Sequence, residues 1–204
     1  MTTGRMANTV TLSTRESLLA AAEKIIVLRG VNALSVRNIG NAAGLNPTLV
    51  TYHFGSLFDL LDELCTLNLE PLLTDWQQID ADSGEHRTLD QVLLCWLAPM
   101  MRPACFTAGG RALVVLDELA AHGEAALKQR VLRAMDAFAL RLRVVLAPLL
   151  PHLAEDDLRA RLRFVAGAAM GPPPRVHAGT AAEGQRSLED LSYLIPFARA
   201  ALEK

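Results

Sequence analysis

Three features of the sequence predict an all-α protein. Leucine, alanine, arginine and glutamate, which favour helices, are abundant through the 204 residues, and long alternating runs of β-branched residues are absent. Apolar residues make up 51% of the chain, enough for a substantial core. Glycines, prolines and short polar stretches divide the chain into about nine segments of helical length. No apolar run reaches the roughly 18 residues of a membrane span, and the N-terminus lacks a signal-peptide core, so we expect a cytoplasmic protein.

The first helix is expected from Ser13 to the residue before Gly30. Ser13 and Glu16 have the spacing of a capping box, which satisfies free backbone N–H groups at a helix start. Apolar residues then recur at helical period and define a buried face: Leu18, Leu19, Ala22, Ile25 and Ile26.

Residues 35–54 predict two short helices joined by a tight turn. Ser35 opens the first helix, and Gly44 stands where the chain must turn, because a residue without Cβ takes positive φ at little cost. Asn46 is the predicted N-cap of the second helix and Pro47 its first residue. This pattern is typical of a helix-turn-helix, whose second helix enters the DNA major groove.

Here the chain resembles the TetR family of bacterial transcriptional repressors. The residues that carry the resemblance span the first quarter of the chain: Thr14-Arg15-Glu16, Ala21-Ala22, Arg29-Gly30, Leu34-Ser35-Val36-Arg37-Asn38-Ile39, Ala42-Ala43-Gly44-Leu45 and Tyr52-His53-Phe54-Gly55-Ser56. The resemblance implies a DNA-binding domain at 1–56 and a helical ligand-binding and dimerisation domain at 57–204. It implies a homodimer on a pseudo-palindromic operator in double-stranded DNA, with a small effector whose binding in the body changes the spacing of the two heads.

Two positions depart from the family pattern. Leu57 occupies the place where the family usually has a phosphate-binding lysine, which implies weaker or less salt-sensitive DNA binding. Gly40 stands where the family usually has alanine and costs up to about 1 kcal/mol in helix propensity.

The predicted DNA-binding residues lie on or beside the second helix of the motif. Thr48 can bond a base or a phosphate, whereas Tyr52 and His53 are expected on phosphate, which positions the protein without reading sequence. Ser35 and Arg37 are expected on backbone phosphate through the preceding helix N-terminus and through charge. The full predicted set is Ser35, Arg37, Asn46, Pro47, Thr48, Leu49, Thr51, Tyr52 and His53.

Beyond the motif, the sequence predicts about six more helices. A helix starts after Ser56 and is kinked or ended by Pro71. Others are expected at about 88–101, from about 111 to 121, at 124–147, 154–170 and 187–203, with interruptions near Pro99 and Pro196. Residues 80–87 read as a loop and 171–186 as a linker, because three consecutive prolines forbid helix.

Charge and cysteine content add little. Residues 1–54 hold five basic and two acidic side chains, a charge of +3, which leaves −5 on the remainder of a chain with net charge −2. A mildly basic head on an acidic body suits a DNA reader. The cysteines at positions 65, 95 and 105 are widely spaced, without a CxxC pair, and we expect reduced core residues.

Large apolar residues of the body are expected either in the core or around a ligand. The resemblance implies a ligand pocket between the body helices, and the apolar body with Trp76 and Trp96 suggests a mostly hydrophobic effector, acyl or aromatic. The candidate lining residues are Trp76, Trp96, Met100, Phe106, Phe138 and Phe164.

The dimer interface is predicted on the last two helices. Residues of each recur on one face at helical spacing: Leu158, Leu162, Val165 and Ala169, then Leu188, Leu191, Ile195 and Ala198. Two such helices from each chain can close a four-helix bundle across a two-fold axis, unless these faces pack within one chain.

Other function classes find less support. The sequence has no nucleophile elbow, glycine-rich phosphate loop or HExxH motif, so neither an enzyme centre nor a metal or organic cofactor is predicted. One alternative is a helical small-molecule-binding protein with a vestigial helix-turn-helix, which the missing lysine at Leu57 would fit. Another is a redox-sensing regulator, which would release DNA in a thiol-dependent way.

Overall fold

The computed structural model describes residues 12–81, 87–171 and 191–204, which fold into nine α-helices without a β-strand. The all-α prediction is thus confirmed. The helices are α1 (Thr14–Arg29), α2 (Val36–Ala43), α3 (Thr48–Phe54), α4 (Leu57–Ala81), α5 (Leu89–Met100), α6 (Ala112–His122), α7 (Ala125–Leu146), α8 (Glu155–Met170) and α9 (Leu191–Glu203). Short 3₁₀ helices at Val31–Ala33 and Ala147–Leu149 were not expected from the sequence. None of the described helices combines the length and apolar character needed to cross a membrane.

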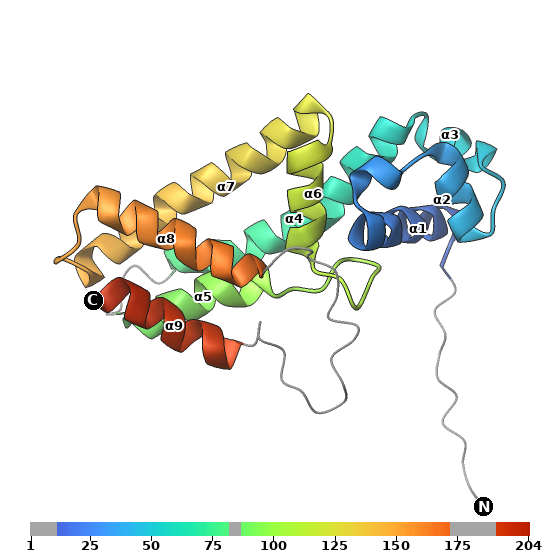
Figure 1. Cartoon of the computed structure of the whole chain (residues 1–204). Coiled ribbons are helices and arrows are strands. Elements are labelled where there is room, and N and C mark those ends of the chain that lie inside the picture. The colour runs from blue at the N-terminus through green and yellow to red at the C-terminus, as the bar shows by residue number, and fades with distance from the viewer. Residues whose placement is uncertain (1–11, 82–86, 172–190) are drawn as a thin grey trace, which may run out of the picture.

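The three N-terminal helices form a head at one end of the molecule (Figure 1). Helix α4 runs from this head into a body of α5–α9. Within the body, α6 is the helix that lies nearest the head and contacts α1. One apolar core continues from the head through α4 into the body, from Leu18 and Val50 to Leu116 and Leu142. Because the core is continuous, the head is packed on the body rather than tethered to it.

Pro71 lies inside α4 and does not end it. Proline in a helix interior removes one backbone hydrogen bond and costs about 3 kcal/mol. Leu69, Leu72 and Trp76, on either side of it, are almost fully buried. Burying a large apolar side chain is worth roughly 1.5–3 kcal/mol, so these three together outweigh the cost. Packing therefore carries the helix through a residue that the sequence marks as a break.

The connection between α5 and α6 is a narrow turn at the junction of head and body. Pro103 and Arg111 form an isolated antiparallel bridge, with the Ala104 N–H donating to the Gly110 carbonyl at 2.9 Å. The Arg111 guanidinium donates to the carbonyls of Ala169 and Met170 at 2.7 and 2.6 Å. The connection is thereby fastened to the C-terminal end of α8.

Candidate nucleic-acid interface and body sites

Helices α2 and α3 and the turn between them have the expected helix-turn-helix geometry. The Ser35 hydroxyl accepts the N–H of Asn38 at 3.1 Å and caps α2. Gly44 has φ of 67°, in the left-handed region that favours glycine, and the Leu45 N–H donates to the Gly40 carbonyl at 2.9 Å. The turn predicted from the sequence is confirmed.

The start of α3 is held by the side chain of Asn46. Its Oδ1 accepts the backbone N–H of Thr48 at 3.0 Å and the Thr48 hydroxyl at 2.8 Å. Helix α3 begins at Thr48, one residue later than predicted, with Pro47 already in helical conformation. Because the Thr48 hydroxyl donates to Asn46, its methyl group and an oxygen lone pair remain for an external partner.

The outward face of α3 consists of polar and aromatic side chains. Thr48 and Thr51 are exposed, and Tyr52 is 81% exposed, which is unusual for a large apolar side chain and suits an external contact. The His53 ring packs edge-on against Tyr52 at 5.1 Å between ring centroids. Leu49, also in the predicted DNA-binding set, is half-buried and packs partly on the core.

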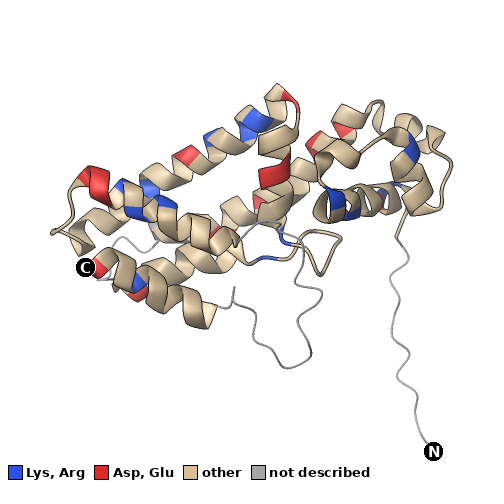
Figure 2. Cartoon of the chain, in the orientation of Figure 1, with Lys and Arg blue, Asp and Glu red and all other residues tan. Residues whose placement is uncertain are grey.

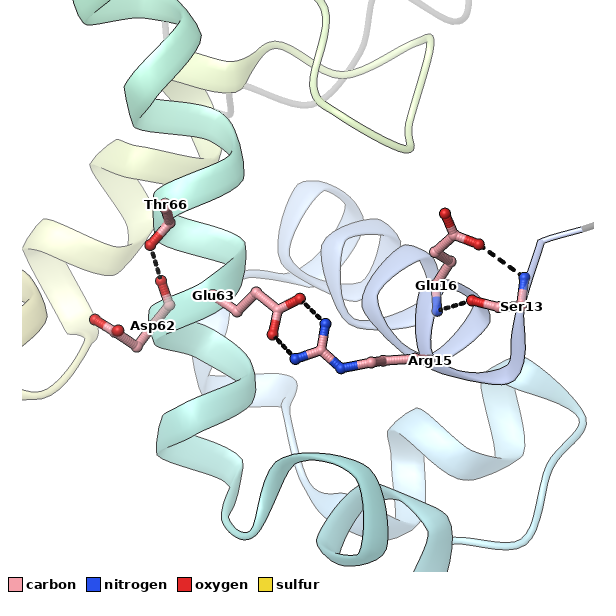
Figure 3. Close-up of polar contacts among 6 residues, drawn as sticks. All are labelled: Ser13, Arg15, Glu16, Asp62, Glu63 and Thr66. Atoms are coloured by element: carbon pink, nitrogen blue, oxygen red, sulfur yellow. Dashed lines mark hydrogen bonds and ion pairs between the residues drawn. The ribbon is translucent and has the colours of Figure 1, made fainter.

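Arg15 of α1 contacts the C-terminal end of α3. Its guanidinium lies over the Phe54 ring, 4.7 Å from the centroid, and makes a two-pronged ion pair with Glu63 of α4 (Figure 3). A planar fork suits both partners at once. In the sequence, Arg15 is one positive charge among several, and this role was not predicted.

The basic side chains of the head lie on α1 and α2, and α1, like α7 and α8, carries acidic side chains as well (Figure 2). Arg37 at the start of α2 is exposed, as are Lys24 and Arg29 on α1. Arg37 is the Lys or Arg residue nearest in sequence to the turn, and its contact with a phosphate stays a prediction.

Four of the six predicted ligand-lining residues are buried in the core. Trp76 and Phe138 stack with 3.8 Å between ring centroids, and the Trp76 indole N–H donates to the Trp96 carbonyl at 3.0 Å. Trp96 and Met100 are also buried, and Phe106 is half-buried against the core. Phe164 is 72% exposed on α8, so its prediction as a pocket residue is wrong.

A cavity of about 530 Å³ opens instead between α4 and α5, and none of the six lines it. Its wall is mostly apolar but carries an ion pair, with the Arg102 guanidinium 3.2 Å from the Asp75 carboxylate. The lining residues are Asp75, Gln78, Leu94, Cys95, Ala98, Pro99, Met101, Arg102 and Pro103. This lining suits a small amphipathic molecule.

The faces predicted for the dimer interface point into the protein's own core. Four α8 residues, namely Leu158, Leu162, Val165 and Ala169, are at most 7% exposed, and Ala198 of α9 is fully buried. Leu191 and Ile195 pack partly buried against the same core, and Leu188 lies outside the described residues. The prediction of these faces is therefore corrected, because α8 and α9 pack on each other and on α5.

The outward faces of the same two helices carry large apolar groups. Phe164 of α8 is 72% exposed, and Tyr193 and Phe197 of α9 are 49% and 50% exposed. Each helix therefore carries exposed aromatic side chains opposite its buried apolar face, which the periodicity of the buried set did not indicate.

The thiols of Cys65 and Cys105 do not have the low pKa of a redox sensor. Burial raises the pKa of the Cys65 thiol, and burial together with the Glu23 carboxylate raises the pKa of the Cys105 thiol. A sensor thiol needs a lowered pKa so that the reactive thiolate forms near neutral pH. The redox alternative accordingly loses its chemical basis at these two positions.

Comparisons with known proteins agree with this geometry. Residues 18–64, from α1 into α4, match the family described as bacterial regulatory proteins, tetR family. None of the curated proteins matches the chain in sequence.

Solved structures share the fold over almost the whole chain. The TetR-family transcriptional regulator PfmR from Thermus thermophilus is 16% identical, with a TM-score of 0.65 over 94% of this chain and 97% of that one. A transcriptional regulator from Aquifex aeolicus is 16% identical, with a TM-score of 0.62 over 94% and 98%. AmtR from Mycobacterium smegmatis is 17% identical, with a TM-score of 0.61 over 98% and 90%.

Proposed function

We propose that the chain is a member of the TetR family of bacterial regulatory proteins, whose family model residues 18–64 match, and that it is a cytoplasmic, ligand-responsive transcriptional repressor that binds operator DNA as a homodimer. The observation that carries the proposal is the outward face of α3, where Thr48, Thr51 and Tyr52 are exposed and Asn46 holds the start of the helix. We divide the chain into a DNA-binding domain at 1–56 and a ligand-binding and dimerisation domain at 57–204.

On DNA, α3 enters the major groove. Thr48 contacts a base edge through its free lone pair or a thymine methyl through its own methyl, whereas Tyr52 and His53 bind phosphate. Arg37 and the N-terminus of α2, which Ser35 caps, approach the adjoining backbone. Leu57, in place of the usual lysine, removes one phosphate contact and lowers the dependence of affinity on salt.

The experiment is selection of a binding site from random duplex DNA, followed by binding titrations at several salt concentrations. Tyr52→Ala is expected to weaken binding to selected and scrambled sites alike, while Thr48→Ala also blurs base preference at one position of each half-site. Asn41→Ala, an exposed change on α2 outside the proposed contacts, is the control. A parent protein that selects no DNA, or two variants that bind like the parent, would refute the assignment of α3.

We place the dimer interface on the outward faces of α8 and α9. Phe164, Tyr193 and Phe197 would interdigitate with the same residues of a second copy across a two-fold axis. Gly167, on the exposed side of α8, has open space where a Cβ would stand, so a partner helix can approach closely. A dimer presents two α3 helices and therefore reads a pseudo-palindromic site.

The effector is proposed to bind in the α4–α5 cavity. Its apolar part would lie on Leu94, Ala98 and Met101, and its polar end would face the Asp75–Arg102 ion pair. The effector would bind one of two body states more tightly and thereby change the spacing of the heads. The coupling free energy between effector binding and DNA binding is typically about 1–3 kcal/mol, and it is reciprocal.

A screen of small amphipathic molecules by thermal shift tests this site, because a ligand of the folded state raises the melting temperature by mass action. Ala98→Trp, which fills the cavity, should abolish the shift produced by any hit. Ala137→Trp, on the exposed surface of α7, is the matched control and should leave the shift unchanged. Hits whose shift survives Ala98→Trp would move the effector site elsewhere in the body.

A further inference from the structure

Among the described residues, two polar side chains are classed as buried, and they bond to each other. Glu23 of α1 is 0% exposed and Asn68 of α4 is 2% exposed. The Asn68 amide donates to Oε1 of Glu23 at 3.0 Å. Burial of a carboxylate is costly unless its oxygens are hydrogen-bonded, so a pair of this kind in an apolar core calls for an explanation.

The remaining bonds of the pair reach the turn between α5 and α6. The other Glu23 oxygen, Oε2, accepts the backbone N–H of Phe106 at 2.7 Å. The Asn68 carbonyl oxygen accepts the backbone N–H of Cys105 at 3.3 Å, and its amide also donates to the Leu64 carbonyl at 3.0 Å. Two side chains thus join the head, α4 and the body turn through directional bonds.

The same turn reaches the other parts of the molecule that take part in the proposed function. Met101, Arg102 and Pro103 line the α4–α5 cavity, two to five residues before the two amides that Glu23 and Asn68 hold. At its other end Arg111 bonds the C-terminal carbonyls of α8. The turn therefore touches the cavity, the head and a proposed dimer helix.

The turn also presses directly on α1. A Cβ at Gly110 would stand 2.8 Å from a methyl carbon of Val27, so the backbone approaches α1 as closely as it can. Nearby, the Glu118 carboxylate of α6 accepts the N–H of Val31 at 3.1 Å, just beyond the end of α1. The turn and α6 are therefore joined to α1 by close packing as well as by hydrogen bonds.

We propose that Glu23 and Asn68 are positioning residues, which fix the angle of the DNA-binding head against the body by holding the amides of Cys105 and Phe106. The state of the cavity then reaches the head through the α5–α6 turn. This inference rests on the proposed function as a DNA-binding regulator. A directional pair specifies one orientation, whereas apolar residues of similar volume would fill the space and allow sliding.

A charge-moving pair of substitutions tests the bonds themselves. Glu23→Gln places an amide N–H₂ against either the Asn68 amide or the Phe106 N–H, and Asn68→Asp places two carboxylates together. In the double variant the new amide at position 23 can donate to the new carboxylate at position 68. The side-chain oxygens at both positions still accept the N–H groups of Phe106 and Cys105. The double variant therefore restores the link between head and turn, while the bond to the Leu64 carbonyl is replaced by an unfavourable contact between two oxygens.

The readouts are affinity for a site that the parent selects and amide hydrogen exchange at positions 105 and 106. Each single variant should lose at least fivefold in affinity and exchange these amides faster, and the double variant should recover most of both. Val131→Ala, a buried change in α7, controls for lost stability and should lower the melting temperature without changing affinity.

Several results would overturn the proposal. Single variants that bind DNA like the parent would show that the bonds do not position the head. A double variant that binds DNA as weakly as the single variants would show that Glu23 and Asn68 act through packing and not through their hydrogen bonds.

The parent alone supplies a test if the single variants fail to fold. DNA should slow exchange of the Cys105 and Phe106 amides, because coupling is reciprocal. Unchanged exchange on DNA would refute the inference. A parent that selects no DNA would instead refute the proposed function, so the two failures are distinguishable.

Discussion

Gly40 of α2 lies directly against Pro47, at the start of α3. A Cβ at position 40 would stand 2.7 Å from the Cα and 2.8 Å from the nitrogen of Pro47. Both are backbone atoms, which cannot rotate away as the end of a side chain can. The departure from the usual alanine therefore has a structural reason in this chain, because α2 and α3 pack more closely than a methyl group allows.

Gly40→Ala should destabilise the head and displace α3. The methyl group gains up to about 1 kcal/mol in helix propensity, but overpacking against rigid atoms typically costs about 1–3 kcal/mol. We expect a net loss of about 1 kcal/mol in the free energy of unfolding, measured with urea, together with weaker DNA binding. Asn41→Ala, at the neighbouring exposed position, gains propensity without the contact and should stabilise slightly. Equal stabilisation by both changes would contradict the packing argument.

The sequence predicted features that depend on neighbours in the chain. The capping box of Ser13 and Glu16, the left-handed Gly44 and the cap supplied by Asn46 are all local, and the structure has each of them. For the same reason most predicted helix boundaries lie close to the observed ones, except in α4, which continues through Pro71. The exposed face of α3 was predictable because the motif fixes which side packs on α1 and α2.

Features that depend on tertiary packing were not predictable from periodicity. Leu162 and Phe164 are both apolar on α8, yet one is buried and the other exposed, because α9 and α5 cover only one side. Trp76 looked equally suited to a pocket and to a core until its stacking on Phe138 was known. Glu23 looked like an ordinary helix charge, since its partners lie 45 and 83 residues away.

Arg15 is expected to stabilise the head mainly through geometry. Arg15→Ala removes the two-pronged ion pair with Glu63 and the contact over the Phe54 ring. Arg15→Lys keeps the positive charge but lacks the planar guanidinium group that makes both contacts. Arg15 is 47% exposed, so screening limits the loss from Arg15→Ala to about 1 kcal/mol, with Arg15→Lys between. Urea unfolding at low and high salt measures this, and Glu63→Gln completes a double-mutant cycle. A coupling energy of zero between Arg15 and Glu63 at both salt concentrations would show that their ion pair does not stabilise the head.

Glu16 should make the stability of α1 depend on pH in the acid range. The backbone N–H and then the side chain of Ser13 hydrogen-bond its carboxylate and lower its pKa from the usual 4.5. A depressed folded pKa stabilises the protein above about pH 4.5, and this contribution is lost as pH falls through the folded value. The stability difference between the parent and Glu16→Gln should therefore persist at pH 7 and shrink toward pH 3. A difference that does not change with pH would contradict it.

The strongest test of assembly compares two exposed apolar residues on different helices. Phe164 on α8 is 72% exposed and Val144 on α7 is 68% exposed, so arginine at either site leaves the monomer core intact. If the outward faces of α8 and α9 form the interface, Phe164→Arg buries charge against its symmetry mate, since an isologous contact repeats the change. We expect Phe164→Arg to sediment as a folded monomer and to bind DNA at least tenfold more weakly, because one head makes half the contacts. Val144→Arg should remain dimeric. Ala169→Arg, inside the core at 1% exposure, should instead lower the melting temperature steeply. If Phe164→Arg remains dimeric and Val144→Arg is monomeric, the interface lies on α7 and not on α8 and α9. If the parent protein is monomeric at micromolar concentration, the proposed homodimer is wrong.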